Sequence, residues 1–299
     1  MNLDALLTTH GPCTGAELLA LAGIEVFPLW QTCRTQAGIV MQHAGQRYLR
    51  LDKRVEGYAR LSPSIGREFL TYTVIGTYAQ REAVVARCLG MQEEFTRISQ
   101  YKRTFARDVL QRLIDTNPHR EQFEAHLCCM IAGDVTYNMA HTVERPEPST
   151  GRPVRGSDLD VILVADELLP AEALTSLDDT LYREKWSMLV LPQIREEIDY
   201  VIKDIAKVMT QLQFDNFRHM VACKILHEGE FLCGNAALFA HLKRMVDEAG
   251  IAEKLAHMAD KAAQEREATE RQLASHPTTE HLQTWQHLFY TNEEQEEIY

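Results

Sequence analysis

One stretch, residues 156–164, constrains the chain most, because two acidic residues there precede an uninterrupted apolar run. Asp158 and Asp160 are separated by a single leucine, and Val161 to Val164 are aliphatic and mostly β-branched. Such a run predicts a buried strand. Because residues i and i+2 of a strand point to the same face, both carboxylates are expected to project from one place at its start.

Two adjacent carboxylates repel each other unless a cation lies between them. Hard oxygen ligands suit Mg²⁺ or Mn²⁺, and a pair of such ions can hold the reacting groups of an in-line phosphoryl displacement. The sequence therefore predicts a site for two divalent ions at Asp158 and Asp160. The alternative is a loop that ends in a strand with solvated acids, because short motifs of this kind often occur by chance.

Composition limits the classes of protein to consider. A chain of 299 residues favours about two domains. The net charge of −12 argues against a general nucleic-acid coat, although a local basic groove is compatible with it. The seven scattered cysteines lack zinc-site spacing and are expected to be reduced. Without a signal peptide or a long apolar run, we expect a cytoplasmic protein with no direct membrane insertion.

Residues 1–54 follow the pattern of a winged helix. Three short helices are expected, the second capped by Thr14 with Glu17 three residues later. Strands at 38–41 and 47–51 would then pair as the wing. The third helix is apolar with one Arg, so DNA reading competes with protein docking or single-strand guiding. In the guiding alternative the basic residues of the wing would contact phosphates: Arg47, Arg50, Lys53 and Arg54.

The rest of the chain divides into three further regions, which together predict an α+β protein. Residues 55–120 form a helical connector, whose long helix at 77–115 has a polar side that includes Lys102. A solvated face is the favoured interpretation of those charges over a nucleic-acid surface. Residues 121–248 are expected to form an α/β core with a mixed sheet, and residues 249–299 are expected to form C-terminal helices and a tail.

The core resembles the DNA polymerase β-like nucleotidyltransferase superfamily. The shared pattern is an apolar residue and Gly, here Ala132-Gly133, then a spacer and Asp-apolar-Asp, here Asp158-Leu159-Asp160. The resemblance implies that Asp158, Asp160 and a third carboxylate on a neighbouring strand hold two Mg²⁺ or Mn²⁺ ions and are catalytic. Asp199 is the best candidate for the third carboxylate, with Glu197 in reserve.

Two other segments bear on the resemblance, which covers about residues 126–245. Residues 220–245 show the expected order of helix, Glu-Gly turn, short strand and helix. Residues 194–212 fit a helix as well as a strand, so the element that carries the third carboxylate stays open. The spacer before the acids is long and includes a Pro-rich insertion at 144–153, which departs from the family pattern.

The same resemblance implies where a nucleotide binds. In the family, the Gly opens a helix whose backbone N–H groups hold the triphosphate. Here that residue is Gly133, and Asp134 stands where Ser or Gly is usual. Thr136 and Ser157 supply hydroxyls nearby. Lys224 would neutralise phosphate charge, although a lysine on a helix surface is its commoner role.

A narrower resemblance concerns the end of the chain. A winged helix, a transferase core and the terminal Tyr299 are similar to the nucleotidyltransferase of bacterial Hailong anti-phage defence systems. This implies a template-independent DNA polymerase that makes oligodeoxyadenylate from dATP on the Tyr299 hydroxyl as primer. The single-stranded DNA product would restrain a membrane effector protein.

Three other interpretations remain open. The tail that carries Tyr299 fits a frayed terminus. A toxin-like transferase would add nucleotides to tRNA or to a protein hydroxyl. A winged-helix DNA-binding regulator would carry a degenerate transferase core.

Overall fold

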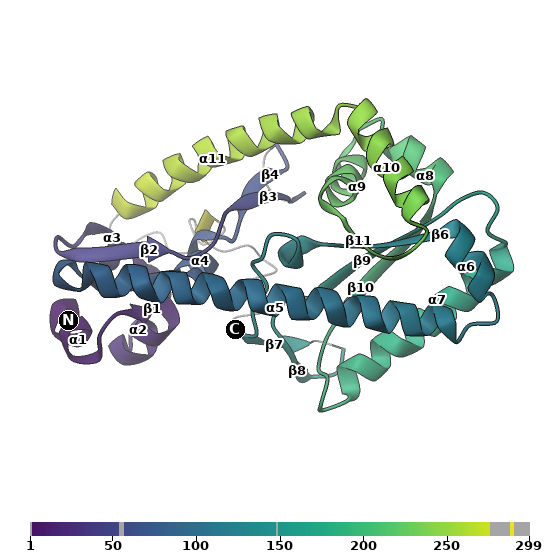
Figure 1. Cartoon of the computed structure of the whole chain (residues 1–299). Helices are drawn as coiled ribbons and strands as arrows, with labels where there is room; N and C mark the ends of the chain where they lie inside the picture. Colours follow the sequence, from purple (N-terminus) through teal and green to yellow (C-terminus); the bar gives the residue numbers. More distant parts are fainter. Residues whose placement is uncertain (1, 54–56, 148, 276–287, 290–299) are drawn as a thin grey trace. The chain divides into compact units, whose positions relative to one another are not determined.

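The computed structural model describes residues 2–53, 57–147, 149–275 and 288–289, and within them the chain is α+β, with eleven α-helices and a four-stranded mixed sheet among its sheets (Figure 1). The chain divides into two compact units. The first unit is Met1–Phe95 with Met258–Tyr299, and the second unit is Thr96–His257. No helix in the described part is long and apolar enough to cross a membrane.

The first unit combines short helices with two small sheets, in which β5 lies between β1 and β2 and β3 pairs with β4. Thr14 caps α2 as expected, since its backbone N–H donates to Glu17 at 2.7 Å and its Oγ1 accepts from the Glu17 N–H at 3.2 Å. The elements are α1 (Leu3–His10), β1 (Cys13–Thr14), α2 (Gly15–Ala22), α3 (Val26–Thr35), β2 (Ile39–His43), β3 (Tyr48–Leu51), β4 (Ala59–Ser62), α4 (Ile65–Tyr72), β5 (Thr73–Thr77), η1 (Tyr78–Gln80), and parts of α5 (Arg81–Asp115) and α11 (Ile251–Ser275).

The strand pairing expected for the wing is wrong. Strand β2 pairs antiparallel with β5, with Ile39 opposite Thr77, and β3 pairs with β4. Val74 and Ile75 of β5 are fully buried, so β5 takes the central position in its sheet. The sheet therefore joins residues on both sides of position 54, and the apolar segment that follows Ser62 belongs to the same core.

The second unit is built on a sheet with the order β10–β9–β6–β11. Strand β10 is parallel to β9, whereas β6 is antiparallel to both β9 and β11, so the sheet is mixed. The elements are α6 (Arg120–His126), β6 (Leu127–Ala132), η2 (Gly133–Val135), β7 (Glu144–Glu147), β8 (Arg152–Arg155), β9 (Leu159–Ala165), α7 (Ala171–Val190), β10 (Ile198–Asp204), α8 (Ile205–Gln211), α9 (Phe217–Glu228), β11 (Glu230–Gly234) and α10 (Ala236–Glu248).

Successive side chains of the central strands point alternately to the two faces of this sheet. Leu159, Val161 and Leu163 of β9 join a buried apolar core with residues of α5 and α7. On the other side, α9 and α10 pack against β6, and Figure 1 shows α8, α9 and α10 grouped across the sheet from α7. Asp160 alternates with the core residues of β9, so it belongs to the face that α9 approaches.

The ambiguous segment at 194–212 forms both elements in succession. Strand β10 covers Ile198–Asp204, and helix α8 begins at the next residue. Asp204 marks the change because its side chain caps α8 by accepting from the Lys207 N–H at 2.6 Å. Asp199 therefore lies on a strand.

Candidate functional site

The sheet brings two of the three expected catalytic carboxylates together. Asp199 on β10 lies opposite Asp160 on β9 in the parallel ladder. In-register residues on neighbouring strands project to the same face, so both acids lie on one face of the sheet, near the start of β9 and of β10. Asp158 immediately precedes the first residue of β9.

Gly133 packs directly against Asp160. Its φ of +70° lies in the left-handed region, and a Cβ at this position would overlap the Asp160 carboxylate oxygen. The expected phosphate-binding helix is here a three-residue 3-10 turn, η2, which the Thr136 hydroxyl caps by donating to the Gly133 carbonyl at 2.8 Å. The Gly133 N–H donates to Glu228 at 3.2 Å. The N–H group that was expected to bind phosphate is therefore bonded to a protein carboxylate.

Asp160 is the electrostatic centre of the site. The Asp160 residue is exposed to solvent. Many protein atoms nevertheless surround its carboxyl group, and the resulting desolvation raises the pKa of this group. The neighbouring carboxylates of Asp134, Asp199 and Glu228 add to this effect, and the pKa reaches about 6. Lys224 offsets part of the repulsion. The excess of negative charge around Asp160 is the condition under which a bound cation is favourable.

Asp158 has a different neighbour from Asp160. Its carboxylate contacts the guanidinium of Arg145, which also donates to Glu197 at 2.8 Å. Asp199 in turn pairs with Lys185 of α7. Two of the three expected metal ligands are thus paired with basic side chains of the protein.

A buried lysine supports the loop that carries the acids. Lys102 of α5 is only 1% exposed and donates to the carbonyls of Arg155 and Ser157 at 3.0 and 2.8 Å. Its third acceptor is the Glu196 carboxylate, which is also buried. The expectation of a solvated role for Lys102 is wrong. Its long side chain reaches from the helix into the loop, where two backbone carbonyls need a donor.

Glu228 connects the end of α9 to the Gly133 turn. Besides the Gly133 N–H, it accepts from the Tyr137 hydroxyl and the Lys224 ammonium. Lys224 also lies over the Tyr137 ring, 5.5 Å from its centroid. Burial and the adjacent Glu228 charge raise the pKa of Tyr137 well above its usual value. Lys224 therefore lies at the site, but as the partner of a carboxylate.

Asp134 and Ser157 link the Gly133 turn to the acid loop. The Ser157 hydroxyl donates to Asp134 at 2.7 Å and accepts from the His141 N–H at 3.3 Å. The Ser157 N–H donates to the His141 carbonyl at 3.2 Å. These bonds give both residues a positioning role.

The donor set of the site fits hard divalent cations in its chemistry. Carboxylate oxygens are the ligands that Mg²⁺ and Mn²⁺ prefer, and Asp160 lies among several of them. In the described part of the chain, no group of three or more His, Cys, Asp or Glu side chains converges closely enough to enclose an ion. Asp158 is paired with Arg145 and Asp199 with Lys185, so both carboxylates already have a counter-ion from the protein.

Three contributors to the site were missed at the level of sequence: Arg145, Glu228 and Tyr137. Glu228 stands in the Glu-Gly turn that marks the family pattern, so its position was a usable signal. Arg145 lies in the Pro-rich insertion, which forms the β7–β8 hairpin. Its partners Asp158 and Glu197 are distant in sequence, and no local pattern identifies such contacts.

The remaining expectations concern the wing and the end of the chain. Arg47 of the first unit is committed to Glu68 and Glu270, at 2.6 and 2.9 Å, and so differs from the expected phosphate contact. Arg54 and the expected primer Tyr299 lie outside the described residues.

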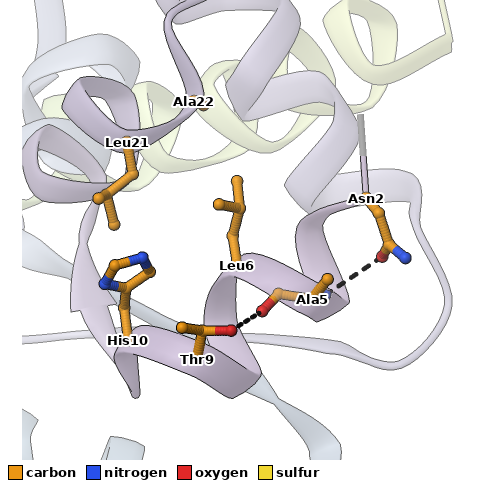
Figure 2. Close-up of a pocket in the computed structure, with 7 residues that line it drawn as sticks. All are labelled: Asn2, Ala5, Leu6, Thr9, His10, Leu21 and Ala22. Carbon is orange, nitrogen blue, oxygen red and sulfur yellow. Dashed lines mark hydrogen bonds between the residues drawn. The ribbon is translucent and has the colours of Figure 1, made fainter.

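A surface pocket of about 480 Å³ lies in the first unit, between α1 and α2, and Figure 2 shows the residues around it. Its polar groups mostly serve α1 itself, since Asn2 accepts from the Ala5 N–H and the Thr9 hydroxyl donates to the Ala5 carbonyl. The lining offers no carboxylate, and His10 is the one titratable side chain in it. It consists of Asn2, Ala5, Leu6, Thr9, His10, Leu21 and Ala22.

Comparison with known proteins adds no assignment to this geometry. No protein-family model matches the chain, and neither a curated protein nor a solved structure shows a significant match to it.

Proposed function

We propose that this chain is a metal-dependent nucleotidyltransferase with a polymerase β-like core. The observation that carries the proposal is the pairing of Asp160 and Asp199 on adjacent parallel strands, beside the positive-φ turn at Gly133. This arrangement supports a shared cation site on one face of the sheet, at the start of β9 and β10. It also supports the interpretation that glycine is needed at position 133 because the backbone there lies close to that site.

Asp158, Asp160 and Asp199 are the residues proposed to hold two Mg²⁺ or Mn²⁺ ions. When bound, such ions lower the pKa of the attacking hydroxyl and stabilise the leaving pyrophosphate. The protein itself shapes the place of the acids: Lys102 holds the loop before Asp158, and the absence of a side chain at Gly133 leaves room for the Asp160 carboxylate. Lys224 is the nearest candidate for a phosphate contact, once it exchanges Glu228 for a nucleotide.

The proposal extends to protein-primed synthesis of oligodeoxyadenylate from dATP, with the Tyr299 hydroxyl as the first acceptor. Its support is the sequence resemblance, in which a hydroxyl-bearing terminus accompanies a transferase core. We likewise infer a winged-helix character for the first unit, supported by the helices α1 to α3 and the strand β2 that follows them. The antiparallel pairing of β2 with β5 makes its sheet different from a local hairpin.

The test is incubation of the purified protein with Mg²⁺ and each labelled NTP or dNTP separately, followed by a denaturing gel and intact mass measurement. Asp160→Asn, Asp199→Asn and Tyr299→Phe variants run alongside, and Asp260→Asn, an acid of the exposed surface of α11, serves as a matched control. We expect a ladder attached to the protein with dATP. The ladder is lost in the first three variants and retained in the fourth.

Different outcomes separate the alternatives. Single-nucleotide additions that survive Tyr299→Phe would indicate another acceptor on a protein or tRNA. No incorporation and no binding of Mn²⁺ or nucleotide would overturn the assignment and favour a regulator with a degenerate core.

A further inference from the structure

The β7–β8 hairpin places a cation on the acid loop. Arg145 of β7 is largely buried, and its Nε donates to the Gly156 carbonyl at 3.0 Å. Its guanidinium donates to Glu197 at 2.8 Å and contacts the Asp158 carboxylate. One guanidinium thus joins two carboxylates and the backbone directly before Asp158.

The hairpin that carries Arg145 is anchored to Arg195 at its base and stabilised by internal hydrogen bonds at its tip. At its base, Glu144 pairs with Arg195 at 2.8 Å, and the Arg155 N–H donates to the Arg195 carbonyl at 2.8 Å. At its tip, Glu147 accepts from the N–H groups of Ser149 and Thr150 at 3.0 and 2.8 Å. Because the backbone is held in this way, the position of Arg145 is a property of the fold.

The two acids of the motif therefore differ in charge balance. Asp158 has Arg145 as a counter-ion, whereas the neighbours of Asp160 are mostly carboxylates. A carboxylate oxygen in contact with a guanidinium must lose that contact, or share it, before it can bind a divalent ion. Two cations at one carboxylate also repel each other.

We propose that Arg145 is a positioning residue that holds Asp158 in the metal-free protein and competes with a divalent cation for its carboxylate. The inference rests on the proposed function, because it assigns Asp158 to metal binding. Metal entry at Asp158 then requires Arg145 to release it, and Glu197 keeps the displaced guanidinium close by. The hairpin insertion would in this way set the affinity of the site for metal.

The first experiment is titration of the full chain with Mn²⁺, followed by electron paramagnetic resonance of the free ion. Arg145→Gln is compared with wild type and with Arg112→Gln, which removes one charge from the exposed Arg112–Glu184 pair. We expect Arg145→Gln to bind Mn²⁺ about fivefold more tightly, as befits loss of a competing ion pair worth about 1 kcal/mol. Arg112→Gln should match wild type, and Asp158→Asn should abolish the effect of Arg145→Gln.

A second measurement uses the wild-type protein and so does not depend on how a variant folds. Phenylglyoxal labels accessible arginines, and peptide mass spectrometry reports each site. Saturating Mn²⁺ should increase labelling of Arg145 and leave Arg112 unchanged.

Unchanged or weaker Mn²⁺ affinity in a folded Arg145→Gln variant would overturn the inference, as would unchanged or reduced labelling of Arg145. Either result with a wild type that binds Mn²⁺ through Asp160 leaves the proposed function standing. Absence of Mn²⁺ binding in wild type and variant alike would reject both.

Discussion

Gly133 shows how one residue without a side chain shapes the site. Its positive φ and its contact with Asp160 are two separate reasons for glycine. The first reason is general, since any L-residue there is strained by about 1 kcal/mol or more. The second is specific to the acid, because an added Cβ would displace the carboxylate.

Gly133→Ala and Gly151→Ala separate these two effects. Gly151 also has a positive φ, of +63°, but an added Cβ would meet nothing within 4 Å. We expect both variants to lose about 1 kcal/mol of stability in urea unfolding. If the chain has the proposed nucleotidyltransferase activity, only Gly133→Ala should lose it, by about a hundredfold, because small misplacements of reacting groups are costly. Equal activity of the two variants would show that Asp160 tolerates displacement.

The strand that follows Asp158 was predicted from a local signal, and the structure confirms that strand. Asp158 and Asp160 stand out because two acids precede an apolar run, and Asp199 is indeed on a strand beside Asp160. The buried position of Lys102 was not predicted. The pattern of a helix surface does not reveal a carbonyl acceptor contributed by a loop more than fifty residues later. Long-range pairing is a property of the folded chain.

At the scale of elements, strand β10 contains a lysine, Lys203, whose charged side chain is buried. Lys203 is 5% exposed, and among the described residues the groups that shift its pKa include Lys207 but no carboxylate. Burial, followed by the nearby charge of Lys207, lowers its pKa from 10.5 to about 8. At neutral pH the folded protein therefore carries a buried charge that the unfolded chain accommodates better.

Replacement of this lysine should stabilise the second unit. Because the folded pKa lies below the unfolded one, the penalty is largest below about pH 8 and is relieved as the pH rises towards 10.5. We expect Lys203→Met to raise the free energy of unfolding at pH 7 by about 1–3 kcal/mol, and to remove the rise of stability between pH 8 and 10. Urea unfolding over this range tests both points, with the exposed Lys261→Met as control. A destabilised Lys203→Met would show that the ammonium has a favourable role.

Elements with a strong period were predictable, and their partners were less so. The helices at 81–115 and 171–190 and the sequence α9–β11–α10 follow from apolar spacing and turn residues. Residues 194–212 gave two compatible periods because a short strand leads directly into a helix. The partner of β2 was missed because β3 is its neighbour in the sequence and was expected to pair with it. Strand β2 pairs instead with β5, about thirty residues later, where more apolar surface is buried.

At the scale of the whole molecule, the last helix returns to the unit that contains the first residues. Leu273 and Phe289 join the core of α1 to α4, and the Phe289 ring lies 5.3 and 5.5 Å from those of Phe27 and Trp30. Arg266 of α11 donates to Glu68 at 3.0 Å and to Glu270 at 2.7 Å. Distant parts of the sequence are thus joined by apolar contacts and by a buried ion-pair network.

Glu68 is the centre of that network and makes the first unit sensitive to acid. Burial opposes its ionisation, but the hydrogen bond from Arg47 and the charges of Arg266 and His43 outweigh it, so its pKa lies below 4.5. Its stabilisation is complete above about pH 4.5 and is lost as the pH falls through the folded pKa. Burial also lowers the pKa of His43 from 6.5, so acidification begins to destabilise the fold earlier, from about pH 6.5.

Glu68→Gln should therefore destabilise the first unit at pH 7 and reduce its further loss of stability below pH 4.5. We expect a cost of about 3 kcal/mol at pH 7, because Arg47 and Arg266 lose one of the two carboxylates that they share, and Glu270 alone must then balance both charges. Urea unfolding at intervals from pH 7 to pH 3 measures both effects, and Glu265→Gln, from an exposed pair on α11, is the matched control. If Glu68→Gln and wild type lost stability in parallel below pH 4.5, another carboxylate would control the acid response. The network would then join the two ends of the sequence without setting their response to pH.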